Sequence, residues 1–86
     1  MLYLVSLGTG NKLFATEDEY QEIKKSLEYL GIKVSAEIVQ EKMYRIQWFD
    51  YIDEEWTDIW CTEDNVADGL NAVKLSEVEY KLTEYN

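Results

Sequence analysis

The chain contains no histidine, no proline and a single cysteine, Cys61. A Cys/His zinc site, a haem ligand set and a nucleophile activated by histidine all need side chains that this sequence does not supply. One cysteine also excludes a disulfide within the chain. These absences remove most metal and triad chemistry, so we expect a protein that is not an enzyme and carries no cofactor.

Long apolar segments are missing as well. No run approaches the roughly 20 apolar residues that span a bilayer, and no apolar leader with a cationic start follows Met1. The net charge of -10 opposes binding to anionic lipid and to nucleic acid, because both are themselves negative. We therefore expect a cytoplasmic protein that binds neither membranes nor nucleic acid directly.

What the chain does contain is apolar surface. Its 86 residues are 47% hydrophobic and 14% aromatic, which distinguishes it from a disordered acidic tail. A chain of this length can bury only a modest hydrophobic core, and a partner or a second copy would add stability. We expect a single domain over residues 1–86, built from two related halves, 1–41 and 42–86.

The first half has the pattern strand, strand, helix, strand. Gly8–Asn11 is typical of a hairpin turn. Thr16 followed by Glu19 predicts a capping box and the start of a helix, and Gly31 predicts its end. The expected strands cover residues 2–7, 12–15 and 32–38, and the apolar stripe of the helix is Tyr20, Ile23, Leu27 and Leu30.

The second half repeats this pattern. Thr62–Asp64 has the same Thr-Glu-Asp sequence as Thr16–Asp18, and a helix is expected over 63–74, weakened by Gly69 in its interior. The expected strands cover residues 42–49, 56–61 and 78–83.

A shift of 46 residues aligns the apolar positions of 13–36 with those of 59–82, whereas the first strands align with a shift of 41. The second hairpin should therefore be five residues longer. We predict an α+β fold, a duplicated β-β-α-β unit in which two helices pack on a mainly antiparallel sheet. Thr16 and Thr62 should both open helices.

Acidic residues concentrate in that longer hairpin and in the helix start that follows. Between Arg45 and Lys74 there is no basic residue, while the rest of the chain has ten acids and eight bases. Aromatic residues are interleaved with the acids, and strand alternation cannot bury all of them. At least one of Phe49, Tyr51, Trp56 and Trp60 should be exposed beside carboxylates. The acids of this interval are Asp50, Asp53, Glu54, Glu55, Asp58, Glu63, Asp64 and Asp68.

The simplest interpretation is that the acids form a solvated face that keeps the protein soluble, with the aromatic residues as its core. Two observations favour a binding surface instead. Like charges in one loop destabilise the fold, and no nearby basic residue neutralises them. Exposed aromatic residues are typical of interface hot spots, and surrounding acids would select a basic partner.

In size, acidity and low cysteine content, the chain resembles the small phage-encoded inhibitor proteins that include DNA mimics and anti-CRISPR proteins. The resemblance rests on composition and assigns no role to an individual residue. It implies a protein whose carboxylates replace phosphates in the nucleic-acid channel of a host enzyme. It also implies that the cytoplasm in question is that of the host cell.

Three enzyme-like patterns have simpler explanations. Residues 50–55 are dense enough in acids to consider a divalent cation, but they lack the ligand spacing and central glycine of a calcium loop. Residues 8–12 lack the Gly-Lys-Ser/Thr ending of a phosphate-binding loop and lead into a strand. Cys61 aligns with Ala15 and is better explained as a small core residue than as a nucleophile.

The leading hypothesis is a noncatalytic inhibitor that binds a basic, nucleic-acid-handling protein, such as a host defence nuclease, by charge mimicry. The alternative is a structural or regulatory interaction module, for instance a homodimer, whose acids only solubilise it. Residues 50, 53, 54 and 55 should form the main recognition edge, and residues 58, 63, 64 and 68 should continue the negative track. The candidate protein-binding residues are Asp50, Tyr51, Asp53, Glu54, Glu55, Trp56, Asp58, Glu63, Asp64 and Asp68.

Overall fold

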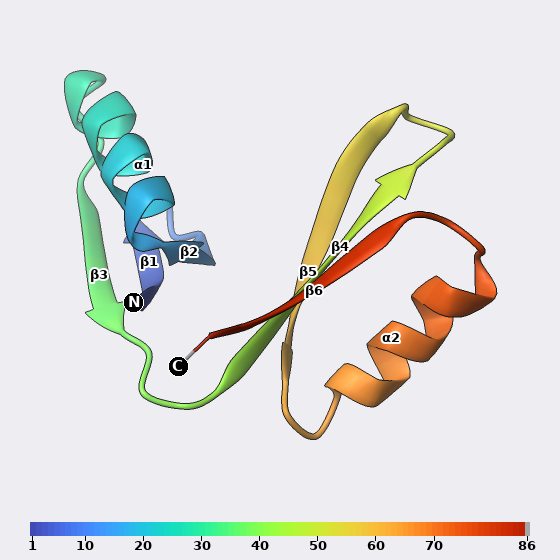
Figure 1. Cartoon of the computed structure of the whole chain (residues 1–86). Coiled ribbons are helices and arrows are strands. Elements are labelled where there is room, and N and C mark those ends of the chain that lie inside the picture. The colour runs from blue at the N-terminus through green and yellow to red at the C-terminus, as the bar shows by residue number, and fades with distance from the viewer. Residues whose placement is uncertain (86) are drawn as a thin grey trace. The chain divides into compact units, whose positions relative to one another are not determined.

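The computed structural model describes residues 1–85 (Figure 1). It divides into two compact units, unit 1 (Met1–Gln40) and unit 2 (Glu41–Tyr85). This boundary lies within one residue of the boundary expected between the two halves of the sequence. Each unit has two antiparallel strands, a helix and a third antiparallel strand, so the predicted α+β class and β-β-α-β units are confirmed.

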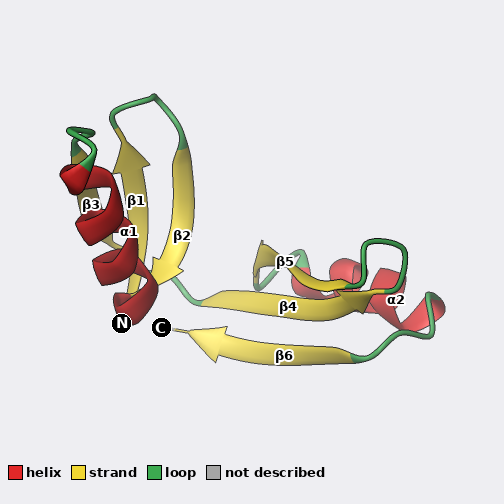
Figure 2. Ribbon diagram, turned by 90° about the horizontal axis from the view of Figure 1, so that it is seen from above, coloured by secondary structure: helices red, strands yellow, loops and turns green. Residues whose placement is uncertain are grey.

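Unit 1 forms a three-stranded sheet in the order β2-β1-β3, with the helix α1 on one face (Figure 2). Its elements are β1 (Leu2–Leu7), β2 (Lys12–Thr16), α1 (Glu17–Tyr29) and β3 (Val34–Ile38). The turn between β1 and β2 closes through a 2.9 Å bond from the Leu7 amide to the Asn11 carbonyl. Gly10 adopts a φ of 95° in this turn, which glycine tolerates best. The predicted hairpin turn is confirmed.

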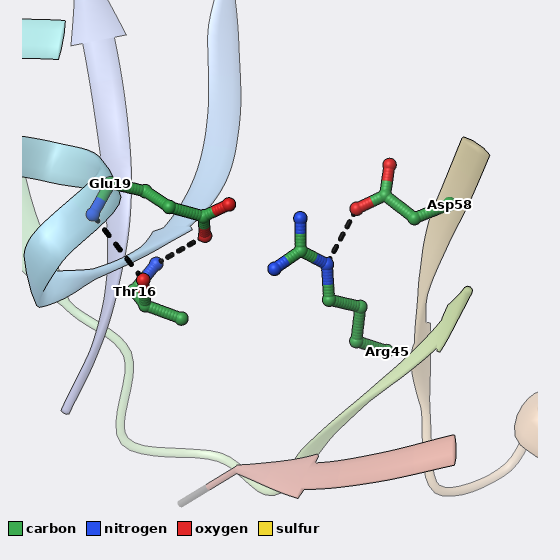
Figure 3. A network of polar contacts seen from close by, with 4 residues as sticks. All are labelled: Thr16, Glu19, Arg45 and Asp58. Carbon is green, nitrogen blue, oxygen red and sulfur yellow. Dashed lines mark hydrogen bonds and ion pairs between the residues drawn. The ribbon is translucent and has the colours of Figure 1, made fainter. Parts of the chain in front are cut away.

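The start of α1 is held by a reciprocal capping box (Figure 3). The Glu19 amide donates to Thr16 Oγ1 at 3.4 Å, and the Thr16 amide donates to Glu19 Oε1 at 3.0 Å. Two amides that the first turn leaves without helical partners are thereby satisfied. The helix ends at Tyr29, one residue before the end of the predicted apolar stripe: Leu30 is the C-cap and 68% exposed. Gly31 follows with a φ of 80°, as expected for the residue that ends the helix.

The buried side chains of unit 1 belong to its strands. Leu2, Val5 and Ala15 are fully buried, whereas α1 contributes no buried residue. The helix packs through half-buried side chains, for example Tyr20, whose ring lies 5.1 Å from that of Tyr3. Local capping therefore matters to α1, because its packing on the sheet is shallow.

Unit 2 has the same strand topology, with the order β5-β4-β6 and the helix α2 on one face of the sheet (Figures 1 and 2). Its elements are β4 (Met43–Asp50), β5 (Glu55–Thr62), α2 (Val66–Leu75) and β6 (Tyr80–Tyr85). Neither α1 nor α2 is long and apolar enough to cross a membrane.

Strand pairing shows that the two units share one register. Shifting the first strand by 41 residues and the other two by 46 converts the pairs of unit 1 into pairs of unit 2. Thus Val5–Leu13 corresponds to Ile46–Ile59, and Tyr3–Ile38 corresponds to Tyr44–Glu84. The duplication inferred from the apolar pattern is therefore supported by hydrogen-bonded pairing. The hairpin over 43–62 is five residues longer than the hairpin over 2–16, as expected.

The start of α2 differs from the prediction. Thr62 does not open this helix: residues 63–65 form a turn, and α2 begins at Val66 after the N-cap Asn65, whose side chain makes no capping bond. Asn65 stands where α1 has Glu19, and its shorter amide side chain donates to Thr62 Oγ1 at 3.2 Å instead. Without a Glu or Gln at this position, the reciprocal capping box cannot form.

Close packing takes the place of that cap in α2. Val73 is buried in a cluster with Ile46 and Cys61. Gly69 lets the helix approach the sheet, because a Cβ at this position would lie only 3.0 Å from Ile46 Cδ1. Burial raises the pKa of the Cys61 thiol, which keeps it in the neutral form. The prediction that Cys61 is a small core residue is confirmed.

Candidate protein-binding site

The tip of the β4–β5 hairpin, residues 50–56, is closed by the side chain of Asp50. Asp50 Oδ1 accepts hydrogen bonds from the amides of Ile52 at 2.9 Å and Asp53 at 3.3 Å. This arrangement is an Asx turn, which explains why an aspartate stands at the end of β4. Asp50 therefore shapes the turn and also places a negative charge at its base.

Three further acids at the tip lack an ion-pair partner among the described residues. Asp53, Glu54 and Glu55 are exposed, and none of them forms an ion pair within residues 1–85. Glu55 lies directly opposite Asp50 in the β4–β5 pairing, and like charges in this position destabilise a hairpin. Glu54 adopts a φ of 55°, a left-handed conformation that favours glycine. The tip thus has two features that lower stability.

Apolar side chains are exposed among these carboxylates. Tyr51 is 59% exposed, Ile52 93% and Trp56 45%. The Phe49 ring holds two of them in place, with edge-on contacts at centroid distances of 4.8 Å to Tyr51 and 5.9 Å to Trp56. The expectation that at least one aromatic ring of the acidic segment is exposed beside carboxylates is confirmed.

A surface hollow of about 270 Å³ lies beside the tip. Its lining comes from residues 48–52 of the hairpin and from Ser76 and Val78 in the α2–β6 connection. A 3.0 Å bond from the Phe49 amide to the Glu79 carbonyl joins the two segments. Two exposed acids of this connection, Glu77 and Glu79, thereby come close to the tip. Sequence reasoning missed both; the expected strand at 78–83 includes only Glu79, and its position beside the tip depends on pairing with β4.

Asp58 differs from the acids of the tip because it has a basic partner. Arg45 Nε donates to Asp58 Oδ2 at 2.6 Å (Figure 3), and the Arg45 guanidinium also lies 4.9 Å from the centre of the Trp60 ring. The inference that nothing nearby neutralises the acidic segment is wrong for this residue. Arg45 precedes the segment in sequence but lies on the adjacent strand, directly opposite Trp60.

The remaining predicted acids lie away from the tip. Glu63 and Asp64 follow the far end of β5, which is about 25 Å long by its residue count. At that end Lys42 pairs with Glu84 at 3.0 Å, and this hydrogen bond, together with the charges of Glu84 and Glu63, raises the pKa of Lys42.

The expected continuation of the negative track is also interrupted by the sheet. Asp68 lies on α2, which packs on the face that includes Ile46 and Ile59. Asp58 precedes Ile59 in β5 and so points to the opposite face. Of the ten candidate residues, the structure brings together Asp50, Tyr51, Asp53, Glu54, Glu55 and Trp56 at one end of unit 2.

No group of three or more His, Cys, Asp or Glu side chains within residues 1–85 is arranged to hold a metal ion. Comparison with protein-family models, with curated proteins and with solved structures finds no match to this chain. The geometry and charge of the tip therefore carry the functional argument.

Proposed function

We propose that this protein is a noncatalytic acidic inhibitor that binds a basic, nucleic-acid-handling protein through the tip of its β4–β5 hairpin. The observation that carries this proposal is a set of three exposed carboxylates, Asp53, Glu54 and Glu55, that form no ion pair within residues 1–85 and lie beside exposed Tyr51 and Trp56. A channel of Lys and Arg that binds phosphates also attracts carboxylates, because both are anionic hydrogen-bond acceptors.

The cost of the tip to stability supports a binding role. A fold under selection for stability alone would favour Gly at position 54 and a cation opposite Asp50. This chain instead has Glu54 at a φ of 55° and Glu55 opposite Asp50. Residues that lower stability at an exposed site are typical of functional surfaces, and a basic partner would relieve the charge repulsion.

In this proposal the acidic residues set the association rate and the aromatic residues set the dissociation rate. Attraction over about one Debye length, about 8 Å at physiological ionic strength, guides a basic partner to the tip. Tyr51 and Trp56 then exclude water from the contact and slow dissociation. We therefore expect charge reversal at the tip to slow association, and Trp56→Ala mainly to speed dissociation.

Capture from a host-cell lysate tests this proposal. The bait is the full chain, compared with a tip-reversed variant, Asp53→Lys with Glu54→Lys. An equally charged control, Glu22→Lys with Glu28→Lys, carries its changes at exposed positions of α1. Wild type and control should retain the same basic protein, which moderate salt and added DNA release, and the tip-reversed variant should lose it. Equal retention by all three baits would contradict the proposal.

The alternative, a homodimer formed through the exposed side chains, draws on Tyr51, Ile52 and Trp56. Such a dimer would bring two acidic tips together, so its stability should rise with salt, whereas a complex with a basic partner should weaken. Sedimentation of the purified chain in low and high salt separates the two. A dimer that strengthens with salt and dissociates in the Trp56→Ala variant would favour the alternative.

A further inference from the structure

The hollow beside the hairpin tip has the composition of a cation-binding pocket. Its lining includes three aromatic residues, Trp48, Phe49 and Tyr51, together with Asp50. Asp50 uses its Oδ1 for the two amides of the turn, and its Oδ2 has no hydrogen-bond partner among residues 1–85. Aromatic rings with an adjacent carboxylate can bind a cation by both its charge and its flat face.

Unit 2 already contains such an arrangement with its cation in place. Arg45 is bound by Asp58 at 2.6 Å and lies 4.9 Å from the centre of the Trp60 ring. Lys81 Nζ also lies 5.1 Å from the centre of the Trp56 ring. On the sheet face opposite α2, then, this fold pairs its tryptophans with cations. The hollow offers rings and a carboxylate, and none of the residues that line it is a cation.

The charge around the hollow favours a basic occupant. The two segments that meet there, residues 49–56 and 76–80, contain no Lys or Arg; the first cation after them, Lys81, lies over the Trp56 ring. They contain six acids: Asp50, Asp53, Glu54, Glu55, Glu77 and Glu79. An uncharged or acidic side chain would gain little from this environment, whereas a cation gains from both the charge and the rings.

We propose that this hollow binds an arginine side chain presented by the basic partner; this inference rests on the proposed function and specifies what the tip recognises. Arginine fits better than lysine for two reasons. Its planar guanidinium stacks on aromatic rings and is more weakly hydrated than an ammonium group. Its fork of donors can also reach a carboxylate oxygen while the plane rests on a ring.

Titration of the isotopically labelled full chain with capped hexa-arginine and hexa-lysine peptides, followed by NMR, tests this inference. Both peptides should bind at the tip in low salt, and hexa-arginine should bind about threefold more tightly. Its largest shifts should be at the amides of Tyr51 and Ile52 and at the Trp48 indole. The tip-reversed variant should lose affinity for both peptides.

Two variants isolate the pocket from the general charge. Asp50→Asn keeps an oxygen that can accept the amide bonds of the turn and removes the charge. Tyr51→Ala removes an exposed ring, and Tyr29→Ala, at a position 91% exposed in unit 1, is its control. Asp50→Asn and Tyr51→Ala should each reduce the ratio of hexa-arginine affinity to hexa-lysine affinity by about two- to fivefold, and Tyr29→Ala should leave this ratio unchanged.

The outcomes separate this inference from the proposed function. Equal affinities for the two peptides, both lost on charge reversal at the tip, would overturn the arginine pocket and leave the acidic tip as the binding surface. An arginine preference that survives both Asp50→Asn and Tyr51→Ala would also overturn the pocket. Unchanged affinity for both peptides in the tip-reversed variant would contradict the proposed function itself.

Discussion

Units 1 and 2 share one strand order and one pairing register, but they hold their helices by different means. In unit 1, the reciprocal bonds of Thr16 and Glu19 fix the start of α1, and no residue of that helix is buried. In unit 2, α2 has no side-chain cap, but it buries Val73 and approaches the sheet at Gly69. One topology thus tolerates either local capping or close packing as the source of helix stability.

The tips of the two hairpins differ even more. Unit 1 turns within residues 8–11, where Gly10 takes the left-handed conformation. Unit 2 places Glu54 in that conformation and adds exposed carboxylates and rings. The turn of unit 1 thus has glycine at its position of positive φ, whereas the turn of unit 2 has a glutamate there and like charges at Asp50 and Glu55. Both features of unit 2 lower the stability of its hairpin. This difference is the structural basis of the proposed binding role.

The largest effect is expected from the matched core positions of the two sheets. Ile46→Ala should lower the free energy of unfolding by about 2–5 kcal/mol, because the side chain is fully buried. Val5→Ala, at the equivalent buried position, should cost less, since it removes fewer carbon atoms. Urea unfolding measures both, and a larger loss for Val5→Ala would break the equivalence of the two cores.

The capping comparison should give the next largest effect. Thr16→Ala should lower the free energy of unfolding by about 1 kcal/mol, because the Glu19 amide loses its acceptor. Thr62→Ala should cost less than about 0.5 kcal/mol, since no helix amide depends on its hydroxyl. Equal losses in urea unfolding would show that the two helices start in the same way after all.

The helix ends offer a test with opposite signs. Gly31 has a φ of 80° and Glu77, 46 residues later, has a φ of 54°. Gly31→Ala should lower the midpoint of thermal unfolding and Glu77→Gly should raise it, each by the equivalent of about 0.5–1 kcal/mol. If Glu77→Gly destabilises the chain, the left-handed conformation at this position is not a source of strain.

The smallest effect on stability is expected from a substitution at the tip, which should also weaken binding to the partner. Glu55→Lys places a cation opposite Asp50 and should raise the free energy of unfolding by about 0.5 kcal/mol. The same change should weaken binding to the basic partner. A variant that is both less stable and fully active in capture would contradict the trade-off.

Much of this fold could be predicted from residue patterns. Period-two and helical spacing located the six strands and two helices, and the two shifts of 41 and 46 predicted the longer second hairpin. The exposure of at least one aromatic ring in the acidic segment also followed from strand alternation, since the rings of the two strands point to both faces of the sheet.

The differences arose where one residue or one long-range contact decided the outcome. The shared Thr-Glu-Asp sequence suggested identical helix starts, but the fourth residue, Glu19 or Asn65, determines whether the capping box closes. The pairing of Asp58 with Arg45 and the position of Glu79 beside the tip depend on which strands are neighbours. Strand order is a property of tertiary structure that local patterns do not contain.

The central claim is that the tip of unit 2, rather than the net charge of the whole chain, recognises a basic partner. The most direct test measures association rates for the captured partner across a salt series, with wild type, the tip-reversed variant and the equally charged α1 control. Wild type and the α1 control should associate at similar rates that fall steeply with salt, and the tip-reversed variant should be at least about tenfold slower in low salt. A salt-independent rate, or equal slowing by the two charge reversals, would contradict the claim.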